Sequence, residues 1–228
     1  MLRGSASKLE AEPLITLFGM SKLKRLPAKF YHQNTFKLAK SLLGKFIVRK
    51  IGSKILIGKI VETEAYYGSK DLASHASRGK TERTKIMFGP AGTAYIYLIY
   101  GMYYCFNIVT EAKEFPAAIL IRAIQPISGF KQAALNYKIK TKFNNSEFRI
   151  QNSLTNGPGK LCRALKIDKK LNGENLINSK KLFLAENPLK TNSSQIKSAK
   201  RIGVDYAGKY KDKLWRYYLK NSEFISKK

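Results

Sequence analysis

The stretch Ile55-Leu-Ile-Gly-Lys-Ile-Val-Glu-Thr-Glu-Ala-Tyr-Tyr67 decides the fold of this chain. Its β-branched and aromatic residues favour an extended strand, and the run Phe46–Ile51 before it has the same character. Gly52-Ser53 between the two runs is the short connection that a β-hairpin needs. We therefore predict a hairpin that begins an antiparallel sheet.

The segments around this hairpin predict further strands and a few short helices. Asn34-Thr35 before Phe36–Leu43 is typical of a capped amphipathic helix, which ends at Gly44. The other predicted elements are a long loop at 68–92, a second hairpin from Thr93–Tyr100 and Met102–Thr110, a strand at Ala117–Ile124, a helix at Ile127–Tyr137, a polar loop at 138–156, a short helix at Lys160–Leu165, and strands at Leu182–Ala185, Ile202–Val204 and Leu214–Leu219.

These elements predict an α+β fold class. Residues 22–228 are expected to form a single mixed domain with a curved, mostly antiparallel β-sheet, a β-hairpin insertion and peripheral helices. Residues 1–21 are expected to be a poorly ordered N-terminal extension, because they lie before the first patterned segment.

The charge of the chain indicates its class of partner. Its 228 residues include 43 Lys and Arg against 15 Asp and Glu, a formal net charge of +28. A compact domain this basic repels itself unless a polyanion offsets the field, so nucleic acid or an anionic membrane is expected. The uncharged stretch 86–110 is rich in glycine and tyrosine, which favours a buried hairpin over a membrane span. A purely compositional origin remains an alternative, since Lys, Asn and Ile are abundant in chains from AT-rich genomes.

Cysteine and histidine are scarce in this chain. Cys105, Cys162, His32 and His75 are the only residues of these two types, and their spacing matches neither a disulfide framework nor a four-ligand zinc site. Both cysteines lie among apolar residues and are expected to be core thiols. We expect neither a metal nor a cofactor.

Two glutamates in the first hairpin are the leading candidates for chemistry. In a strand, Glu62, Glu64 and Tyr66 share one face. Burying charge beside Ile60 and Val61 is costly unless the charge is paired or used. One interpretation is an edge strand with solvated glutamates, and the other is a carboxylate that positions or activates water beside an aromatic wall. The scarcity of acidic residues in this basic chain favours the second.

The second hairpin concentrates tyrosines. Tyr95 and Tyr97 alternate and so share a face, and Tyr100 with Gly101 falls at the predicted turn. The hairpin is either a Tyr-rich part of the core or a set of stacking walls with a wedge at its tip. Asn107 lies in an apolar run, so its amide must be hydrogen-bonded or used.

Three further polar residues are candidates for the same site. His75 lies in the loop that follows the glutamate-bearing strand and is either solvated or part of that site. Arg122 is alone among apolar strand residues and needs an anion partner, either one of the two glutamates or a phosphate. Lys160 follows Asn156-Gly-Pro-Gly159, where glycines either let backbone amides approach a phosphate or form an ordinary turn.

Together these segments resemble the alkyladenine type of 3-methyladenine DNA glycosylase. The matching stretches are Gly58–Gly68, His75, Met87–Asn107 and Leu120–Pro126, with weaker support from Asn156–Cys162 and Arg201–Val204. Their order and spacing agree from residue 30 to the C-terminus, and 138–156 is the least family-like segment.

The resemblance implies a role for the residues around the glutamates. Glu64 would direct the attacking water, with Arg122 close to that water. Tyr66, His75 and Tyr97 would enclose a flipped base. Each role agrees with what the residue types suggest on their own, because an anion stabilises a developing oxocarbenium ion and aromatic faces attract a cationic base.

The resemblance also implies which residues read and hold the DNA. Asn107 would discriminate against the exocyclic amine of normal guanine. Tyr100 would fill the gap that the flipped base leaves, with Met102 nearby, and Lys160 would contact the DNA.

The expected function is that of a monofunctional base-excision repair glycosylase. It would flip alkylated or deaminated purines out of double-stranded DNA and hydrolyse the N-glycosidic bond with a Glu64-positioned water, leaving an abasic site. We expect a monomer in the bacterial cytoplasm, associated with the nucleoid and with no membrane partner. The alternative is a non-catalytic RNA- or ribosome-binding protein, which explains the charge but gives Glu64 and Tyr100 no role.

Overall fold

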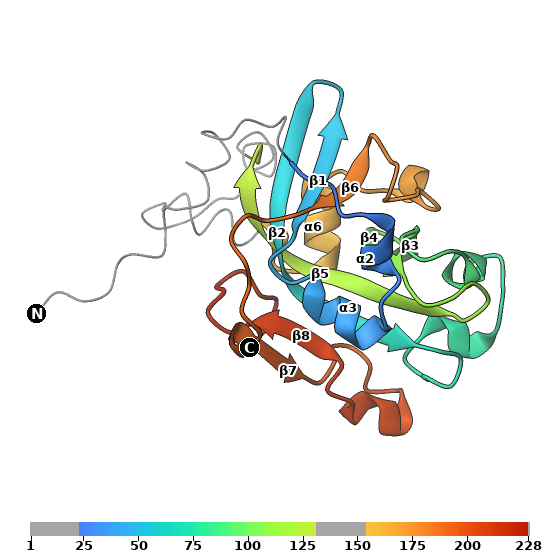
Figure 1. The fold of residues 1–228 in the computed structure, drawn as a ribbon. Helices are drawn as coiled ribbons and strands as arrows, with labels where there is room; N and C mark the ends of the chain where they lie inside the picture. Colours follow the sequence, from blue (N-terminus) through green and yellow to red (C-terminus); the bar gives the residue numbers. More distant parts are fainter. Residues whose placement is uncertain (1–22, 131–153, 228) are drawn as a thin grey trace, which may run out of the picture.

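Residues 23–130 and 154–227 are described by the computed structural model, and they form a curled, antiparallel sheet with short helices around it (Figure 1). The strands along the main path are, in spatial order, β3 (Ala94–Ile99), β4 (Tyr103–Val109), β5 (Ala117–Ser128), β2 (Lys54–Tyr67), β1 (Phe46–Ile51) and β6 (Leu182–Ala185). β8 (Arg216–Leu219) branches from β2, and β7 (Ile196–Ala199) pairs with β8. The predicted α+β fold, a single mixed domain built on a curved antiparallel sheet, is confirmed.

The 14-residue strand β2 is the centre of this arrangement. Its first half pairs with β1 on one side, its second half pairs with β8 on the same side, and β5 follows it along the other side. Glu62 and Glu64 lie in the half that β5 and β8 enclose. The two glutamates are fully buried because the segments at Ile202 and Ser226 also cover the face of β2 that they share.

Three predicted elements differ from the structure. The helix predicted from Ile127 is wrong at its start, because β5 continues through Ser128 and buries Ile127 against Phe183 and other apolar residues. Residues 131–137 of that helix, and 138–153 of the predicted polar loop, lie outside the described residues. The strand predicted at Ile202–Val204 is wrong as well, since the chain there is irregular and turns its amides toward β2. β7 escaped prediction because its sequence, Ile-Lys-Ser-Ala, is short and mostly polar.

The helices are short and lie around the sheet. They are α2 (Ala28–Tyr31), α3 (Thr35–Ser41) and α6 (Pro158–Ala164), with 3-10 turns η2 (His75–Arg78), η3 (Lys85–Phe88), η4 (Lys169–Leu171), η5 (Ser193–Gln195) and η6 (Gly208–Asp212). The helix predicted after Asn34 is confirmed as α3, and the Asn34 side chain accepts a hydrogen bond from the Phe36 amide at 3.1 Å. The short helix predicted near Lys160 is confirmed as α6.

One face of the sheet holds the main hydrophobic core. α3 packs on β2 and β5, and α6 packs on β4 and β5. The core between them includes Leu38, Phe106, Ile121 and Cys162, all buried. Cys105 is buried as well, on the opposite face with its strand partner Tyr97, so the prediction of two buried thiols is confirmed.

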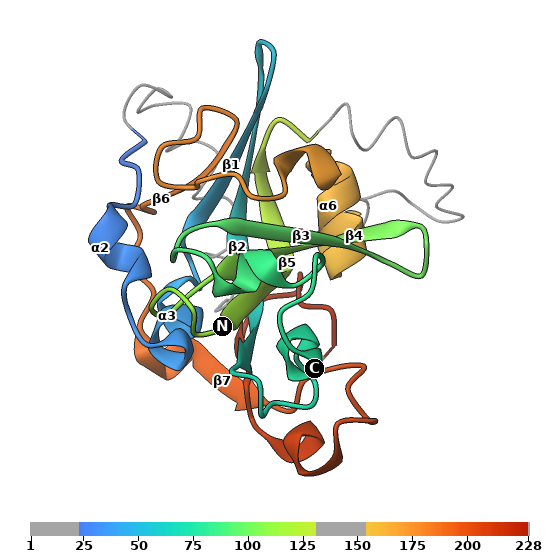
Figure 2. The same cartoon turned by 90° about the vertical axis from the view of Figure 1, so that its right-hand side faces the viewer.

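The opposite face of the sheet is covered by loops instead of helices. The loop 68–92, with η2 and η3, contributes Ala76 and Met87 to a cluster with Tyr95 of β3. The segment 200–215 contributes Val204 and Ala207 to a cluster with Ala73 of that loop. Figures 1 and 2 both show this red segment beside the teal loop, below the central strands. Glu64, Tyr66 and Tyr97 lie on this face, where Ile202 and Arg201 of the segment and His75 of the loop contact them.

Within the described part of the chain, no helix is long and apolar enough to cross a membrane. The uncharged stretch 86–110 forms η3 and the β3–β4 hairpin instead. In Figure 2 this hairpin crosses the view, and its turn projects at the right, past α6.

Candidate active site

The register of the sheet brings motifs from four strands into one row. Tyr95 of β3 pairs with Asn107 of β4, Asn107 pairs with Leu120 of β5, and Leu120 pairs with Glu64 of β2. Paired residues in an antiparallel sheet point to the same face. The row therefore lies on the loop-covered face, opposite the main core, and it brings Glu64 next to Leu120, a residue 56 positions later in the sequence.

Glu64 is fully buried and holds three hydrogen bonds. The Tyr66 hydroxyl donates to its Oε2 at 2.9 Å, and the Arg122 guanidinium donates to the same oxygen at 3.3 Å. The backbone amide of Ile202 donates to its Oε1 at 2.8 Å. The interpretation of a solvated edge strand is therefore wrong, because the carboxylate is removed from water and held by dedicated donors.

A bulge between β2 and β5 aims Arg122 at the carboxylates. Glu62 pairs with Ala123 and the next residue of β2 pairs with Ile121, so Arg122 is left between them without a partner in the register. Such bulges redirect a side chain. The guanidinium lies 3.3 Å from Glu64 Oε2 and 3.5 Å from Glu62 Oε1. The predicted need for an anion partner is confirmed, and both glutamates meet it.

Glu62 is also fully buried, but its partners come from the end of the chain. Arg216 of β8 donates to Oε1 at 2.9 Å, the Ser226 hydroxyl donates to Oε1 at 3.0 Å, and the Ser226 amide donates to Oε2 at 2.6 Å. These contacts fasten the C-terminal segment to the centre of the sheet.

Aromatic rings gather beside Glu64. The rings of His75 and Tyr97 meet edge to face with centroids 4.4 Å apart, and Tyr97 lies 5.4 Å from Tyr95. The Nδ1 atom of His75 and the Tyr95 hydroxyl are 2.9 Å apart. Tyr66 completes the group from β2, through its hydrogen bond to Glu64. The structure thus brings together the three side chains that the sequence suggested as walls of a base pocket.

The protonation states in this group follow from burial. Burial, and then the Glu64 carboxylate, raise the pKa of Tyr66 well above its ordinary value. Burial likewise raises the pKa of Tyr97. Burial, with the positive charges of Arg83 and Arg78, lowers the pKa of His75 to about 4. At neutral pH the tyrosines therefore keep their protons and the imidazole is neutral, so the rings present uncharged, hydrogen-bonding surfaces.

Asn107 is buried in the same row, with 3 % of its surface exposed. Its side-chain amide donates to the Tyr95 carbonyl at 3.1 Å. The prediction that this amide must be hydrogen-bonded or used is confirmed for its donor side. The bond fixes the amide plane against the neighbouring strand.

The tip of the β3–β4 hairpin is exposed. Tyr100 is 83 % exposed and Met102 is 67 % exposed. Tyr100 has φ +53° and Gly101 has φ +69°, the two left-handed residues of a tight hairpin turn. A tyrosine in this conformation costs about 1–2 kcal/mol relative to glycine, so its presence at the turn needs a reason other than folding.

Lys160 lies apart from the buried row. It is exposed on α6, and its Nζ donates to Asn156 Oδ1 at 2.8 Å. A Cβ atom at the preceding Gly159 would lie 2.9 Å from Tyr103, so this glycine lets α6 pack close to the hairpin. The structure thus places Lys160 near the exposed hairpin and away from Glu64.

Several residues around the site escaped the sequence-based analysis. Asp71 and Arg201 form a buried ion pair, Ile202 contributes only its amide, and Arg83 lies 5.2 Å from the Tyr97 ring centroid. Backbone donors leave no signal in a sequence. A signal was present for Arg201, which opens a stretch already matched to the glycosylases, but a mid-chain arginine among 43 basic residues does not stand out.

Comparison with known proteins agrees with this geometry. Residues 29–223 match the family model of methylpurine-DNA glycosylase. A Clostridium perfringens protein, provisionally named a 3-methyladenine DNA glycosylase, is 47 % identical over 206 residues, which are 90 % of this chain and 100 % of that protein. Proteins with the same provisional name from Desulfitobacterium hafniense and Legionella pneumophila are 46 % and 44 % identical, again over 90 % of this chain and 100 % of each relative.

The chain is therefore a DNA glycosylase, a hydrolase of DNA repair. It belongs to the methylpurine-DNA glycosylase family, and the resemblance found in its motifs is confirmed. The alternative of a non-catalytic RNA- or ribosome-binding protein is set aside, since such a protein would share neither this family nor these relatives.

Proposed function

We propose that this glycosylase excises alkylated or deaminated purines from double-stranded DNA, and that Glu64 positions and activates the attacking water. The observation that carries the proposal is the environment of Glu64. Its carboxylate is fully buried, is held by a tyrosine, an arginine and a backbone amide, and lies beside a group of uncharged aromatic rings. The names of the relatives support 3-methyladenine as one substrate.

The DNA would first be bound through charge and then opened by the hairpin tip. A formal net charge of +28 attracts the phosphate backbone without regard to sequence. A base inside a duplex is inaccessible, so the nucleotide must be flipped outward, at a cost of a few kcal/mol. The exposed Tyr100 ring offsets part of this cost if it fills the vacated position in the stack. Met102 beside it and Lys160 near the hairpin are suited to the flanking minor groove and backbone.

The flipped base would then stack among Tyr66, His75 and Tyr97. A cationic base such as 3-methyladenine gains about 0.5–2 kcal/mol over an aromatic face. A neutral His75 adds no repulsion toward such a base. Asn107 is held rigidly by its bond to the Tyr95 carbonyl, and a rigid polar group rejects an extra exocyclic amine by clash or by leaving a polar atom unpaired.

Hydrolysis breaks the bond between the sugar carbon and the purine nitrogen. Positive charge develops on the sugar ring, and the Glu64 carboxylate stabilises it. The water gives its oxygen to the sugar carbon and one proton to Glu64, while the bonding electron pair leaves with the purine. A cationic purine such as 3-methyladenine leaves as a neutral base, whereas a neutral purine such as hypoxanthine leaves as an anion and takes a proton from solvent water. Glu64 then passes its proton to solvent. Arg122 donates to Glu64 Oε2 and so orients the carboxylate. The products are the free purine and an abasic site.

The same proposal includes the setting in which the enzyme acts. We expect a monomer that works on nucleoid DNA in the bacterial cytoplasm. One copy of the chain supplies every side chain named above, so no second copy is needed to complete the site.

The deciding experiment is Glu64→Gln on a duplex that contains hypoxanthine or 3-methyladenine. Removing a group that activates water and stabilises the developing charge costs about 100- to 10,000-fold in rate. We therefore expect the variant to bind the lesion duplex normally and to release free base at least about 1,000-fold more slowly in single-turnover assays. A rate within about tenfold of wild type, equivalent to about 1.4 kcal/mol, would show that Glu64 is not the catalytic group.

A further inference from the structure

Arg201 makes the most connected buried ion pair among the described residues outside the Glu62–Arg122 group. Its two terminal nitrogens lie 2.6 and 2.8 Å from the two oxygens of Asp71, and both side chains are fully buried. Such a two-pronged pair fixes direction as well as distance. It joins the segment 200–215 to the loop 68–92, the two elements that cover the loop-covered face of the sheet.

The same guanidinium reaches two further backbone groups. One nitrogen donates to the Ala65 carbonyl of β2 at 3.0 Å, and the other donates to the Tyr210 carbonyl of η6 at 3.2 Å. Arg201 therefore ties the central strand, the loop and the C-terminal segment together at one point.

Arg201 also lies next to the residues that hydrogen-bond Glu64. Its Cζ atom lies 4.7 Å from the centroid of the Tyr66 ring and 5.0 Å from that of Trp215. The next residue, Ile202, donates its amide to Glu64 Oε1 at 2.8 Å. Tyr66 and the Ile202 amide supply two of the three hydrogen bonds that Glu64 receives. Arg201 is thus adjacent, in space or in sequence, to both.

Stabilisation of the fold alone does not account for the buried Arg201–Asp71 pair. Burying an ion pair costs desolvation that its mutual attraction barely repays, and a packed apolar pair is often as stable. The Nε atom of Arg201 is buried without a hydrogen-bond partner, which adds to the cost. Burial by itself lowers the pKa of Arg201, and the Asp71 carboxylate more than reverses this, so the pKa of Arg201 is raised and the charge persists. A charge retained at a net cost is expected where it specifies a geometry.

We propose that Arg201 is a positioning residue of the excision reaction, which holds the Tyr66 ring and the Ile202 amide in place around Glu64. The proposal rests on the proposed role of Glu64. The Arg201 side chain is fully buried and acts through the two donors that orient the carboxylate. Asp71 is its anchor.

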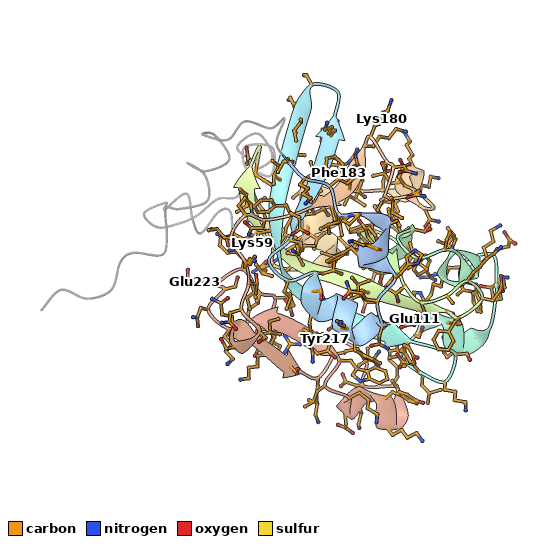
Figure 3. The ribbon with its side chains drawn as sticks, viewed as in Figure 1. Lys59, Glu111, Lys180, Phe183, Tyr217 and Glu223 are labelled. Atoms are coloured by element: carbon orange, nitrogen blue, oxygen red, sulfur yellow. The ribbon has the colours of Figure 1, made fainter. Side chains whose placement is uncertain are left out.

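The test compares Arg201→Met and Arg201→Lys with a matched control, Arg25→Met. Arg25 shares two of these kinds of contact, to backbone carbonyls and to an aromatic ring: it donates to the carbonyls of Leu176, Ile177 and Ser179 at 2.8–3.3 Å and lies 3.9 Å from the Phe183 centroid. Phe183 is on β6, at the opposite end of the sheet path from β3 (Figure 3). Each variant is assayed as the full chain for thermal unfolding, for lesion-duplex Kd, and for single-turnover excision at saturating enzyme.

Both methionine variants should unfold at lower temperature, because each loses a multiply bonded arginine. Only Arg201→Met should slow excision at saturation, by about 100-fold, the cost of misplacing a catalytic group by about 1 Å. Its Kd should change less than its rate. Arg201→Lys keeps the charge beside Asp71 and should recover part of the rate, and Asp71→Asn should slow excision in the same direction as Arg201→Met while leaving the arginine in place.

Two results would overturn the proposal. One is an excision rate for Arg201→Met within about threefold of Arg25→Met at saturation, a difference of less than about 0.7 kcal/mol. The other, decisive if Arg201→Met does not fold, is a folded Arg201→Lys and Asp71→Asn pair that both excise at the wild-type rate. The Glu64→Gln assay is run beside them: if that variant stays active, the proposed function fails, whereas a dead Glu64→Gln with fully active Arg201 variants rejects only the positioning role.

Discussion

Glu62 and Glu64 differ by two positions on β2, yet they form two different kinds of carboxylate site. Both are fully buried, both point to the loop-covered face and both contact Arg122. Glu62 receives its remaining bonds from Arg216 and Ser226. Glu64 receives its remaining bonds from Tyr66 and from the irregular segment at Ile202. The difference lies in what surrounds each carboxylate, since the residue type and the burial are the same.

The surroundings indicate the use of each carboxylate. The cluster around Glu62 is apolar, and it contains Val61, Ala123, Tyr218, Phe224 and Ile225. That cluster packs the C-terminal segment onto the sheet, so Glu62 serves as an anchor for the end of the chain. The neighbours of Glu64 are the rings of Tyr66 and Tyr97, whose pKa values are raised by burial, and His75 contacts Tyr97 in turn. Burial alone therefore does not identify a catalytic carboxylate. Its hydrogen-bond partners and neighbours must be considered as well.

The largest expected effects come from changing each glutamate to glutamine. Glu64→Gln should abolish excision and keep most of the stability, because Arg122 retains Glu62. Glu62→Gln should do the reverse. Arg216, 6 % exposed, would lose its anion, and breaking a buried pair costs about 3–5 kcal/mol. Chemical denaturation and single-turnover excision on the same two variants give the comparison directly.

The contrast between the two sites fails if the two variants behave alike. Equal losses of excision per folded molecule would mean that Glu62 and Glu64 work as one coupled unit through Arg122. A stable but inactive Glu62→Gln would exchange their roles, since Glu62 lies on the same strand face.

The sequence predicts much of this site because the decisive residues lie in strands. The alternation of Glu62, Glu64 and Tyr66 places them on one face whatever the tertiary fold, and a lone Arg122 among apolar residues demands an anion. What the sequence could not show is how strands pair and what loops do. The bulge that aims Arg122 depends on the register of β2 with β5, and the Ile202 amide reaches Glu64 only because the chain there fails to form the predicted strand. Only these tertiary contacts show that Glu62 and Glu64 have different surroundings.

The next-largest effect concerns the exposed tip of the β3–β4 hairpin, which our proposal places against the DNA. Tyr100→Ala removes the exposed ring at the hairpin turn and should slow excision of a well-paired lesion by about 100-fold, since filling the gap offsets a few kcal/mol of unstacking. The same lesion opposite a mismatched base already flips easily and should lose less. Single-turnover rates in the two contexts give the ratio.

Equal losses in both contexts would remove Tyr100 from the wedge role. The strain of a tyrosine at φ +53° would then lack a functional reason. Met102→Ala is the next variant to compare, because Met102 is the other strongly exposed side chain at the tip.

A smaller effect follows from the neutral imidazole beside Tyr97. The pKa of His75 is about 4 in the folded state against 6.5 for the ordinary residue. Between these values the unfolded chain binds more protons, so the stability that His75 contributes is present above pH 6.5 and is lost as pH falls toward 4. Wild type should therefore lose more unfolding free energy than His75→Gln when both are titrated from pH 7 to pH 5.

The control for this titration is Arg83→Gln. Burial is the first cause of the lowered pKa of His75 and the charge of Arg83 is the second, so this variant should raise the pKa of His75 and reduce the difference between the two curves. If the unfolding free energies of wild type and His75→Gln change in parallel with pH, the imidazole is not neutral in the folded enzyme. A neutral aromatic group would then not distinguish the surroundings of Glu64 from those of Glu62.

The smallest effect, at Ser226, tests how far the two sites are separable. Its hydroxyl donates to Glu62 Oε1 at 3.0 Å and accepts from Arg122 Nε at 3.0 Å, so it is a link between the anchor and the shared arginine. Ser226→Ala removes both bonds but keeps the Ser226 amide on Glu62 Oε2. A hydrogen bond contributes about 1 kcal/mol net, so we expect the loss of two bonds to lower the stability by about 1–2 kcal/mol.

Excision by Ser226→Ala should stay within about threefold of wild type, a change of less than about 0.7 kcal/mol in the activation free energy. The reason is that Arg122 still reaches Glu64 through its terminal nitrogen, which does not contact Ser226. Urea unfolding measures the change in stability, and single-turnover excision measures the change in rate. A loss of excision greater than about tenfold, with stability and Kd unchanged, would mean that Ser226 sets the orientation of Arg122 toward Glu64. The C-terminal segment that contacts Glu62 would then contribute to the catalytic site. Glu62 and Glu64 would form one site, joined by Arg122.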